Sequence, residues 1–131
     1  MANQTSSSEP HQPGPILIVE DDDDIRETLV AVLSDEGHEI MAAADGAEAL
    51  DILRQALLLP RLILLDLMMP VMNAWDFREE LLKTEQLRVI PIVLLSGDAR
   101  VVDKSVGLGA AAALLKPISL AQLLDVVEQF H

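Results

Sequence analysis

The sequence lacks residues on which several classes of protein depend. It has no cysteine, which excludes disulfides, thiolate metal sites and a cysteine nucleophile. Tyrosine is also absent and aromatic residues make up only 2% of the chain, so the core must be aliphatic. The chain has nine basic and 22 acidic residues, which gives a net charge of −13. Such a charge repels phosphate backbones, so we expect no direct binding of nucleic acid.

Long uninterrupted apolar runs are missing as well. The most apolar stretch, from Ala56 to Met72, is broken by two prolines and two charged residues, so we expect no membrane insertion. The N-terminus shows no basic segment followed by an apolar one, and a cytoplasmic location is therefore expected. Residues 1–14 are rich in Ser, Gln, Pro and Gly and are predicted to form a disordered tail. Residues 15–131 are predicted to form one domain.

Short apolar segments alternate with amphipathic helical patterns along residues 15–131. The alternation predicts an α/β fold, in which a five-stranded parallel sheet carries helices on both faces. The flavodoxin-like strand order 2-1-3-4-5 fits so short a chain best. The predicted strands are Pro15–Val19, His38–Ala43, Leu62–Leu65, Pro91–Leu95 and Ala112–Leu115.

Capping residues precede the predicted helices. The first helix is predicted to end near Gly37, and the fourth to run through Val102 and Val106. Leu82 and Leu120 are predicted to face the core. The predicted caps are Asp23 or Asp24, Asp45, Asp98 and Ser119, and His38 is predicted to be an edge residue and not a ligand.

Chemically useful side chains follow four of the predicted strands. Taken singly, the acids and the serine could be helix caps and the lysine a surface charge. Taken together, they are expected at one edge of the sheet, where open α/β sheets bind ligands. Oxygen ligands without His or Cys favour Mg²⁺, with Mn²⁺ as the alternative ion. A carboxylate nucleophile, a cation, a lysine and a hydroxyl are the parts needed for phosphoryl transfer. The set comprises Glu20, Asp21, Asp66, Ser96 and Lys116.

Four segments carry a resemblance to a known family. Ile-Val-Glu-Asp-Asp, Leu-Leu-Asp-Leu-Met-Met-Pro, Leu-Leu-Ser-Gly and Leu-Leu-Lys-Pro occur in this order over residues 15–131. In order and spacing the chain resembles the receiver domain of bacterial response regulators. The resemblance implies that Asp66 accepts a phosphoryl group from a sensor histidine kinase or a phosphotransfer protein, and that the chain is a signalling domain and not an enzyme acting on other substrates.

The same resemblance implies roles for the remaining site residues. Ser96 and Lys116 would hold the phosphoryl oxygens. The Lys116–Pro117 peptide would be cis. Mg²⁺ would be bound by Asp21, Asp66 and the backbone carbonyl of Met68, with Glu20 assisting through water.

The chain departs from the family pattern at several positions. The loop after Pro70 has Val71 and Ala74 where the family usually has glycines, and Asn73 where it has an aspartate. An alanine at a position of positive φ would cost on the order of 1 kcal/mol. Ala113 stands where the family normally has Tyr or Phe, which puts the usual transmission of the signal in doubt.

Three functions therefore remain open from the sequence. The first is a phosphorylatable domain that is expected to have no output domain of its own and to shuttle phosphate, or to signal through a separate partner. The second is a degenerate receiver that binds partners without phosphorylation, which Ala113 favours. The third is a Mg²⁺-dependent enzyme, which the lack of a Gly-rich phosphate loop and of a nucleophile elbow disfavours.

Overall fold

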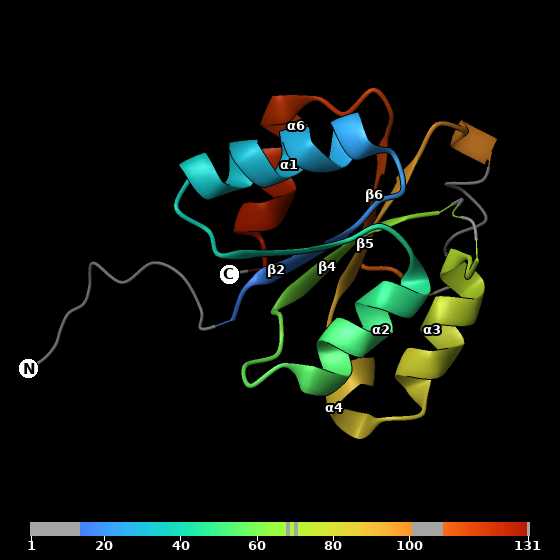
Figure 1. Cartoon of the computed structure of the whole chain (residues 1–131). Coiled ribbons are helices and arrows are strands. Elements are labelled where there is room, and N and C mark those ends of the chain that lie inside the picture. Colours follow the sequence, from blue (N-terminus) through green and yellow to red (C-terminus); the bar gives the residue numbers. More distant parts are fainter. Residues whose placement is uncertain (1–13, 68, 70, 101–108, 131) are drawn as a thin grey trace, which may run out of the picture.

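The computed structural model describes residues 14–67, 69, 71–100 and 109–130. The predicted fold is confirmed: five parallel strands form one sheet in the order β3-β2-β4-β5-β6, which is 2-1-3-4-5 along the chain (Figure 1). The strands are β2 (Ile16–Val19), β3 (Ile40–Ala43), β4 (Leu62–Asp66), β5 (Ile92–Ser96) and β6 (Ala112–Leu115).

Helices cover both faces of the sheet (Figure 1). On one face lie α1 (Asp23–Asp35) and α6 (Leu120–Glu128), and on the other α2 (Gly46–Gln55), α3 (Ala74–Leu82) and the short α4 (Glu85–Arg88). Each layer packs on its own aliphatic cluster, so the central strands are buried on both sides. None of the described helices is long and apolar enough to cross a bilayer.

The ends of α1 show how the chain leaves and re-enters the sheet. Its N-cap is Asp22, whose Oδ1 accepts a hydrogen bond from the N–H of Ile25 at 2.9 Å, so the prediction of Asp23 or Asp24 was wrong. The helix ends before Gly37, as expected, and this glycine has a φ of +95°. The N–H groups of Gly37 and His38 donate to the carbonyls of Ser34 and Leu33, a Schellman motif.

Other local predictions need correction. The second strand begins at Ile40 instead of His38. Leu82 and Leu120, predicted to face the core, are 46% and 54% exposed. The helix α4 had no counterpart in the prediction. Asp98 accepts a hydrogen bond from the N–H of Arg100, but residues 101–108, which carry the rest of the predicted fourth helix, lie outside the described residues.

A second polar group lies at the amino edge of the sheet. His38 is buried there, and its Nδ1 lies 2.6 Å from Nη2 of Arg61. Arg61 Nη1 also donates to the carbonyl of Phe130 at 2.9 Å, and burial lowers the pKa of this guanidinium. Arg61 thereby ties the end of α6 to the start of β4.

The loop before α3 contains the one non-glycine residue with positive φ in the described parts of the chain. Val71 has a φ of +69° and is 81% exposed. A β-branched residue in this region is a backbone outlier. Ala74, where a positive φ was considered, is instead buried at the start of α3 and is preceded by the N-cap Asn73.

We therefore predict that Val71→Gly raises the free energy of unfolding by about 1 kcal/mol. Relief of the left-handed strain outweighs the extra chain entropy that glycine gives the unfolded state. Urea denaturation of both proteins measures the change. Val71→Ala is the matched control and should gain less, because alanine keeps its Cβ. A Val71→Gly protein less stable than the parent would contradict the inference that Val71 is strained by its positive φ.

Candidate functional site

Strand register brings the candidate residues to one edge of the sheet. Val19 pairs with Leu65 across β2 and β4, so Glu20 and Asp66, the next residues, lie at the same level. Ser96 ends β5 and is paired with Leu115 of β6, so Lys116 follows at the next position. Four separate strands thus deliver their carboxyl-terminal residues to the same place, as the sequence predicted.

Three carboxylates converge at this edge. One oxygen from each of Glu20, Asp21 and Asp66 lies within 4.8 Å of the other two. Glu20 is fully buried and Asp66 nearly so, whereas Asp21 is exposed. Glu20 Oε2 accepts a hydrogen bond from the N–H of Asp22 at 3.1 Å. The cluster therefore has two acids beneath the surface and a third, Asp21, that closes it toward solvent.

Lys116 supplies the positive charge of the cluster. Its Nζ lies 2.8 Å from Glu20 Oε1 and 3.3 Å from Asp66 Oδ1. Hydrogen bonds and the charges of these two acids raise the pKa of Lys116 in spite of its burial, so the amine stays protonated. One ammonium group among three carboxylates leaves the site net negative.

This excess of negative charge shifts the pKa values of two of the acids. Burial raises the pKa of Asp66 to about 7, and its hydrogen bond with Asp21 and the charge of Glu20 act in the same direction. The pKa of Asp21 is lowered, chiefly by its hydrogen bond with Asp66. Near neutral pH the pair therefore shares a proton, in the place where a bound cation would neutralise charge.

The donor set fits Mg²⁺. The ligands of an octahedral Mg²⁺ lie roughly 3 Å apart when adjacent and roughly 4 Å apart when opposite, and these oxygens lie within 4.8 Å of one another. All three candidate ligands are carboxylates, which suit a hard cation. The fully buried Glu20 already contacts Lys116 and the N–H of Asp22, so Asp21 and Asp66 are better placed for direct ligation.

The structure describes most, but not all, of the remaining predicted site residues. Ser96 is buried, and its Oγ accepts a hydrogen bond from the N–H of Asp98 at 3.1 Å. The N–H of Lys116 donates to the carbonyl of Ser96 at 2.7 Å, and the Lys116–Pro117 peptide is cis. Met68 lies outside the described residues. Ala113 is half-buried against the cluster beneath α2 and α3.

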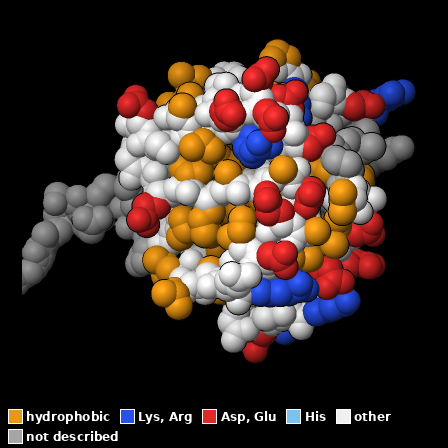
Figure 2. Space-filling view, viewed as in Figure 1, with side chains coloured by type: hydrophobic (Ala, Val, Ile, Leu, Met, Phe, Trp, Pro, Cys, Tyr) orange, Lys and Arg blue, Asp and Glu red, His pale blue; other side chains and the backbone are white. Residues whose placement is uncertain are grey.

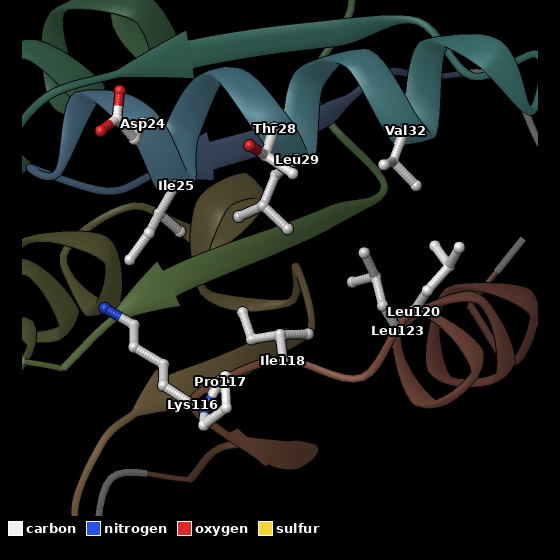
Figure 3. Close-up of a pocket in the computed structure, with 10 residues that line it drawn as sticks. All are labelled: Asp24, Ile25, Thr28, Leu29, Val32, Lys116, Pro117, Ile118, Leu120 and Leu123. Atoms are coloured by element: carbon white, nitrogen blue, oxygen red, sulfur yellow. The ribbon is translucent and has the colours of Figure 1, made fainter.

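A groove of about 460 Å³ begins beside Lys116 (Figure 3). It runs between α1 and the segment that joins β6 to α6, and the Lys116 amine extends toward the carboxyl end of β4. Thr28 and Asp24 add polar groups on the α1 side. Most of its lining is aliphatic: Ile25, Leu29, Val32, Pro117, Ile118, Leu120 and Leu123.

Comparison with known proteins agrees with this geometry. The sequence model described as "Response regulator receiver domain" matches residues 16–128. The chain belongs to this family. The resemblance stated from the four motifs is thus confirmed, and the strand order is that of its structural neighbours, the receiver domains.

Relatives of this receiver domain include regulators and sensor kinases. The transcriptional regulatory protein AfsQ1 of Streptomyces coelicolor is 37% identical over 112 residues, 84% of this chain and 47% of AfsQ1. The chemotaxis protein CheY4 of Vibrio cholerae has a TM-score of 0.80 and 29% identity, with 90% of this chain and 98% of that chain covered.

A third neighbour was solved with a metal ion. The receiver domain of the sensor histidine kinase PA1611 from Pseudomonas aeruginosa has a TM-score of 0.80 and 26% identity, with 89% of this chain and 95% of that one covered. It holds a magnesium ion in its active site cleft. This receiver domain spans about half the length of the first curated relatives, 44% to 47% of three of them and 62% of another.

The structure also shows contacts of this receiver domain that the sequence analysis missed. Arg26 reaches back from α1 and donates to the carbonyl of Glu20 at 2.9 Å. It also pairs with Asp23, at 2.5 Å. The spacing of Asp23 and Arg26, three residues apart on a helix, was a signal for this ion pair. Nothing in the sequence indicated the contact with the Glu20 carbonyl.

The surface of this receiver domain carries the charge imbalance of the sequence. Acidic side chains are spread over the face shown in Figure 2, and basic ones are few. Over the whole sequence, 22 acidic residues outnumber nine basic ones. The acid cluster therefore lies in a negative field, which attracts cations.

We predict that Asp66→Asn stabilises the metal-free protein at pH 8 by on the order of 2 kcal/mol. Between about pH 4 and pH 7 the folded chain keeps a proton on Asp66 that the unfolded chain, with an ordinary pKa of 3.8, has lost, and at pH 8 the folded chain carries an ionised carboxylate in an unfavourable place. Stability of the parent should therefore fall as pH rises from about 4 to about 7, and the amide removes this slope.

Denaturation in urea at pH 4 and pH 8, with chelator present, measures both proteins. The gain from Asp66→Asn should vanish at pH 4, where both side chains are neutral. Asp51→Asn on the exposed side of α2 is the matched control and should show no such pH dependence. Equal gains at both pH values would contradict the assigned pKa direction.

Proposed function

We propose that this chain is the phosphoryl-accepting domain of a two-component system, and that Asp66 is the acceptor. The observation that carries the proposal is the convergence of Lys116 and two further acids on Asp66, with Lys116 Nζ 3.3 Å from Asp66 Oδ1. Receiver domains work with histidine kinases or phosphotransfer proteins. The donor is therefore a phosphohistidine on such a protein.

The chain's own residues have separate tasks in the transfer. An Asp66 carboxylate oxygen attacks phosphorus, the new P–O bond forms an acyl phosphate, and the P–N bond breaks with its electron pair returning to the imidazole. Lys116 stays charged and faces the developing negative charge on the phosphoryl oxygens. The Ser96 hydroxyl, now bonded to Asp98, can turn to donate to the same oxygens.

A divalent cation completes this site. Asp21, Asp66 and the carbonyl of Met68 would hold Mg²⁺, with Mn²⁺ as an alternative and Glu20 assisting through water. When bound, the ion would neutralise charge on the carboxylates and on the phosphoryl group. The shared proton on the acid pair supports this, because the carboxylates need a positive partner to ionise together.

Ala113 favours a second candidate, a receiver that binds partners without phosphorylation. The side chain is a methyl group where the family carries an aromatic ring, and it packs against the core cluster of β4, α2 and α3. A signal from Asp66 therefore cannot be read through a ring at this position. The intact acids and Lys116 support the first candidate more strongly.

Several attributes of the whole protein stay predictions. The named relatives are transcriptional regulators of which this chain matches about half. Residues 15–131 themselves carry an acidic surface, so we propose that they bind protein partners and not nucleic acid. A cytoplasmic location and a disordered tail over residues 1–14 likewise stay predictions.

We predict that acetyl phosphate with Mg²⁺ adds one phosphoryl group to the chain. Intact-mass spectrometry measures the addition, and a chelator in place of Mg²⁺ should abolish it. Asp66→Asn should remain unlabelled, because the amide is no nucleophile toward phosphorus.

Asp76→Asn, an exposed substitution on α3, is the matched control and should label like the parent. Labelling of the Asp66→Asn protein would place the acceptor elsewhere. If the parent is never labelled by any donor, the phosphorylation-independent candidate is favoured.

A further inference from the structure

Five consecutive acids, from Glu20 to Asp24, enter the site region, but they do not share one task. Glu20 is buried against Lys116, and the Asp22 side chain caps α1. Asp21 is the member of the Asp21–Asp24 run whose carboxylate joins the cluster with Asp66. Of the other aspartates, Asp23 is held by an ion pair outside the cluster.

Arg26 makes that contact. Its Nη1 donates to the backbone carbonyl of Glu20 at 2.9 Å, and its Nη2 pairs with Asp23 Oδ1 at 2.5 Å. The Arg26 side chain is only 19% exposed, whereas that of Asp23 is 76% exposed. One planar guanidinium thus links the start of the β2–α1 turn to the first residue of α1. Its two nitrogens are held in a fixed fork, a geometry that the single nitrogen of a lysine does not reproduce.

This clamp contributes little to the free energy of unfolding of the whole chain. An ion pair with one partner so exposed contributes little to stability because water screens it. Its consequence is local: the Glu20 carbonyl is fixed, and so is the direction in which Asp21 leaves the strand. Groups that orient metal ligands typically change metal affinity by about 10- to 100-fold when they are lost.

We propose that Arg26 is a positioning residue for the cation site, and that it preorganises Asp21 by clamping the Glu20 carbonyl and Asp23. The inference rests on the proposed function, since it concerns the same Mg²⁺ site. The sign of the effect separates positioning from simple electrostatics. Loss of a positive charge beside a cation site strengthens cation binding, whereas loss of positioning weakens it.

Titration calorimetry with MgCl₂ alone, on the full chain at pH 8, tests the proposal with three variants. Arg26→Gln removes both the charge and the fork, and should weaken Mg²⁺ binding about 10-fold. Arg26→Lys keeps the charge but loses the two-nitrogen fork, and should also bind more weakly than the parent. Arg88→Gln on α4 removes one positive charge from an exposed position and is the matched control, with affinity unchanged or slightly higher.

A second readout uses the metal-free protein. The N–H of Asp22 donates to Glu20 Oε2, so its hydrogen exchange reports the order of the turn. Exchange at Asp22 should be several-fold faster in Arg26→Gln, with the thermal midpoint nearly unchanged. This measurement also shows whether the variant has kept its fold.

The outcomes are distinct. The proposal would be overturned if Arg26→Gln bound Mg²⁺ as tightly as Arg88→Gln or more tightly. It would also be overturned if Arg26→Lys bound Mg²⁺ as tightly as the parent, because charge alone would then suffice. Unchanged exchange at Asp22 would overturn it too. If the parent chain bound no Mg²⁺ at all, the proposed function and this inference would both be overturned.

Discussion

Repulsion among carboxylates in a partly buried cluster is the constraint on which this structure depends. Glu20, Asp21 and Asp66 approach within 4.8 Å of one another, and Lys116 offsets only part of their charge. A proton on the Asp21–Asp66 pair offsets more of it, which is why the pKa of Asp66 is raised to about 7. The aliphatic sheet supplies the rigidity that holds the acids together, because β2 and β4 are buried on both faces.

The same constraint links the site to neighbouring elements. The Lys116 N–H is bonded to the Ser96 carbonyl, and the Ser96 hydroxyl is bonded to Asp98. A new charged group on Asp66 would compete for Lys116 and Ser96, and would thereby alter the contact between Ser96 and Asp98. With Ala113 in place of an aromatic ring, no large side chain at that position could pass on such a change.

Much of the fold and of the site could be predicted because both depend on strand ends. Asp66 and Lys116 each follow an apolar run directly, and parallel strands must align those ends. The cap at Asp22 was missed because consecutive aspartates offer equally good caps by sequence. Leu82 and Leu120 were misassigned because an apolar residue at a helix end keeps the helical pattern even where no neighbouring element covers it. The reach of Arg26 depends on tertiary geometry that no local pattern contains, whereas the family's usual glycine at the position of Val71 was a signal for the positive φ found there.

The most direct test of this account is a high-resolution crystal structure of the chain grown with Mg²⁺. We expect one octahedral ion about 2.1 Å from carboxylate oxygens of both Asp21 and Asp66. We also expect the Lys116 amine to remain beside Asp66. An ion bound elsewhere, or an acid cluster that stays closed on its shared proton at high Mg²⁺ concentration, would contradict it.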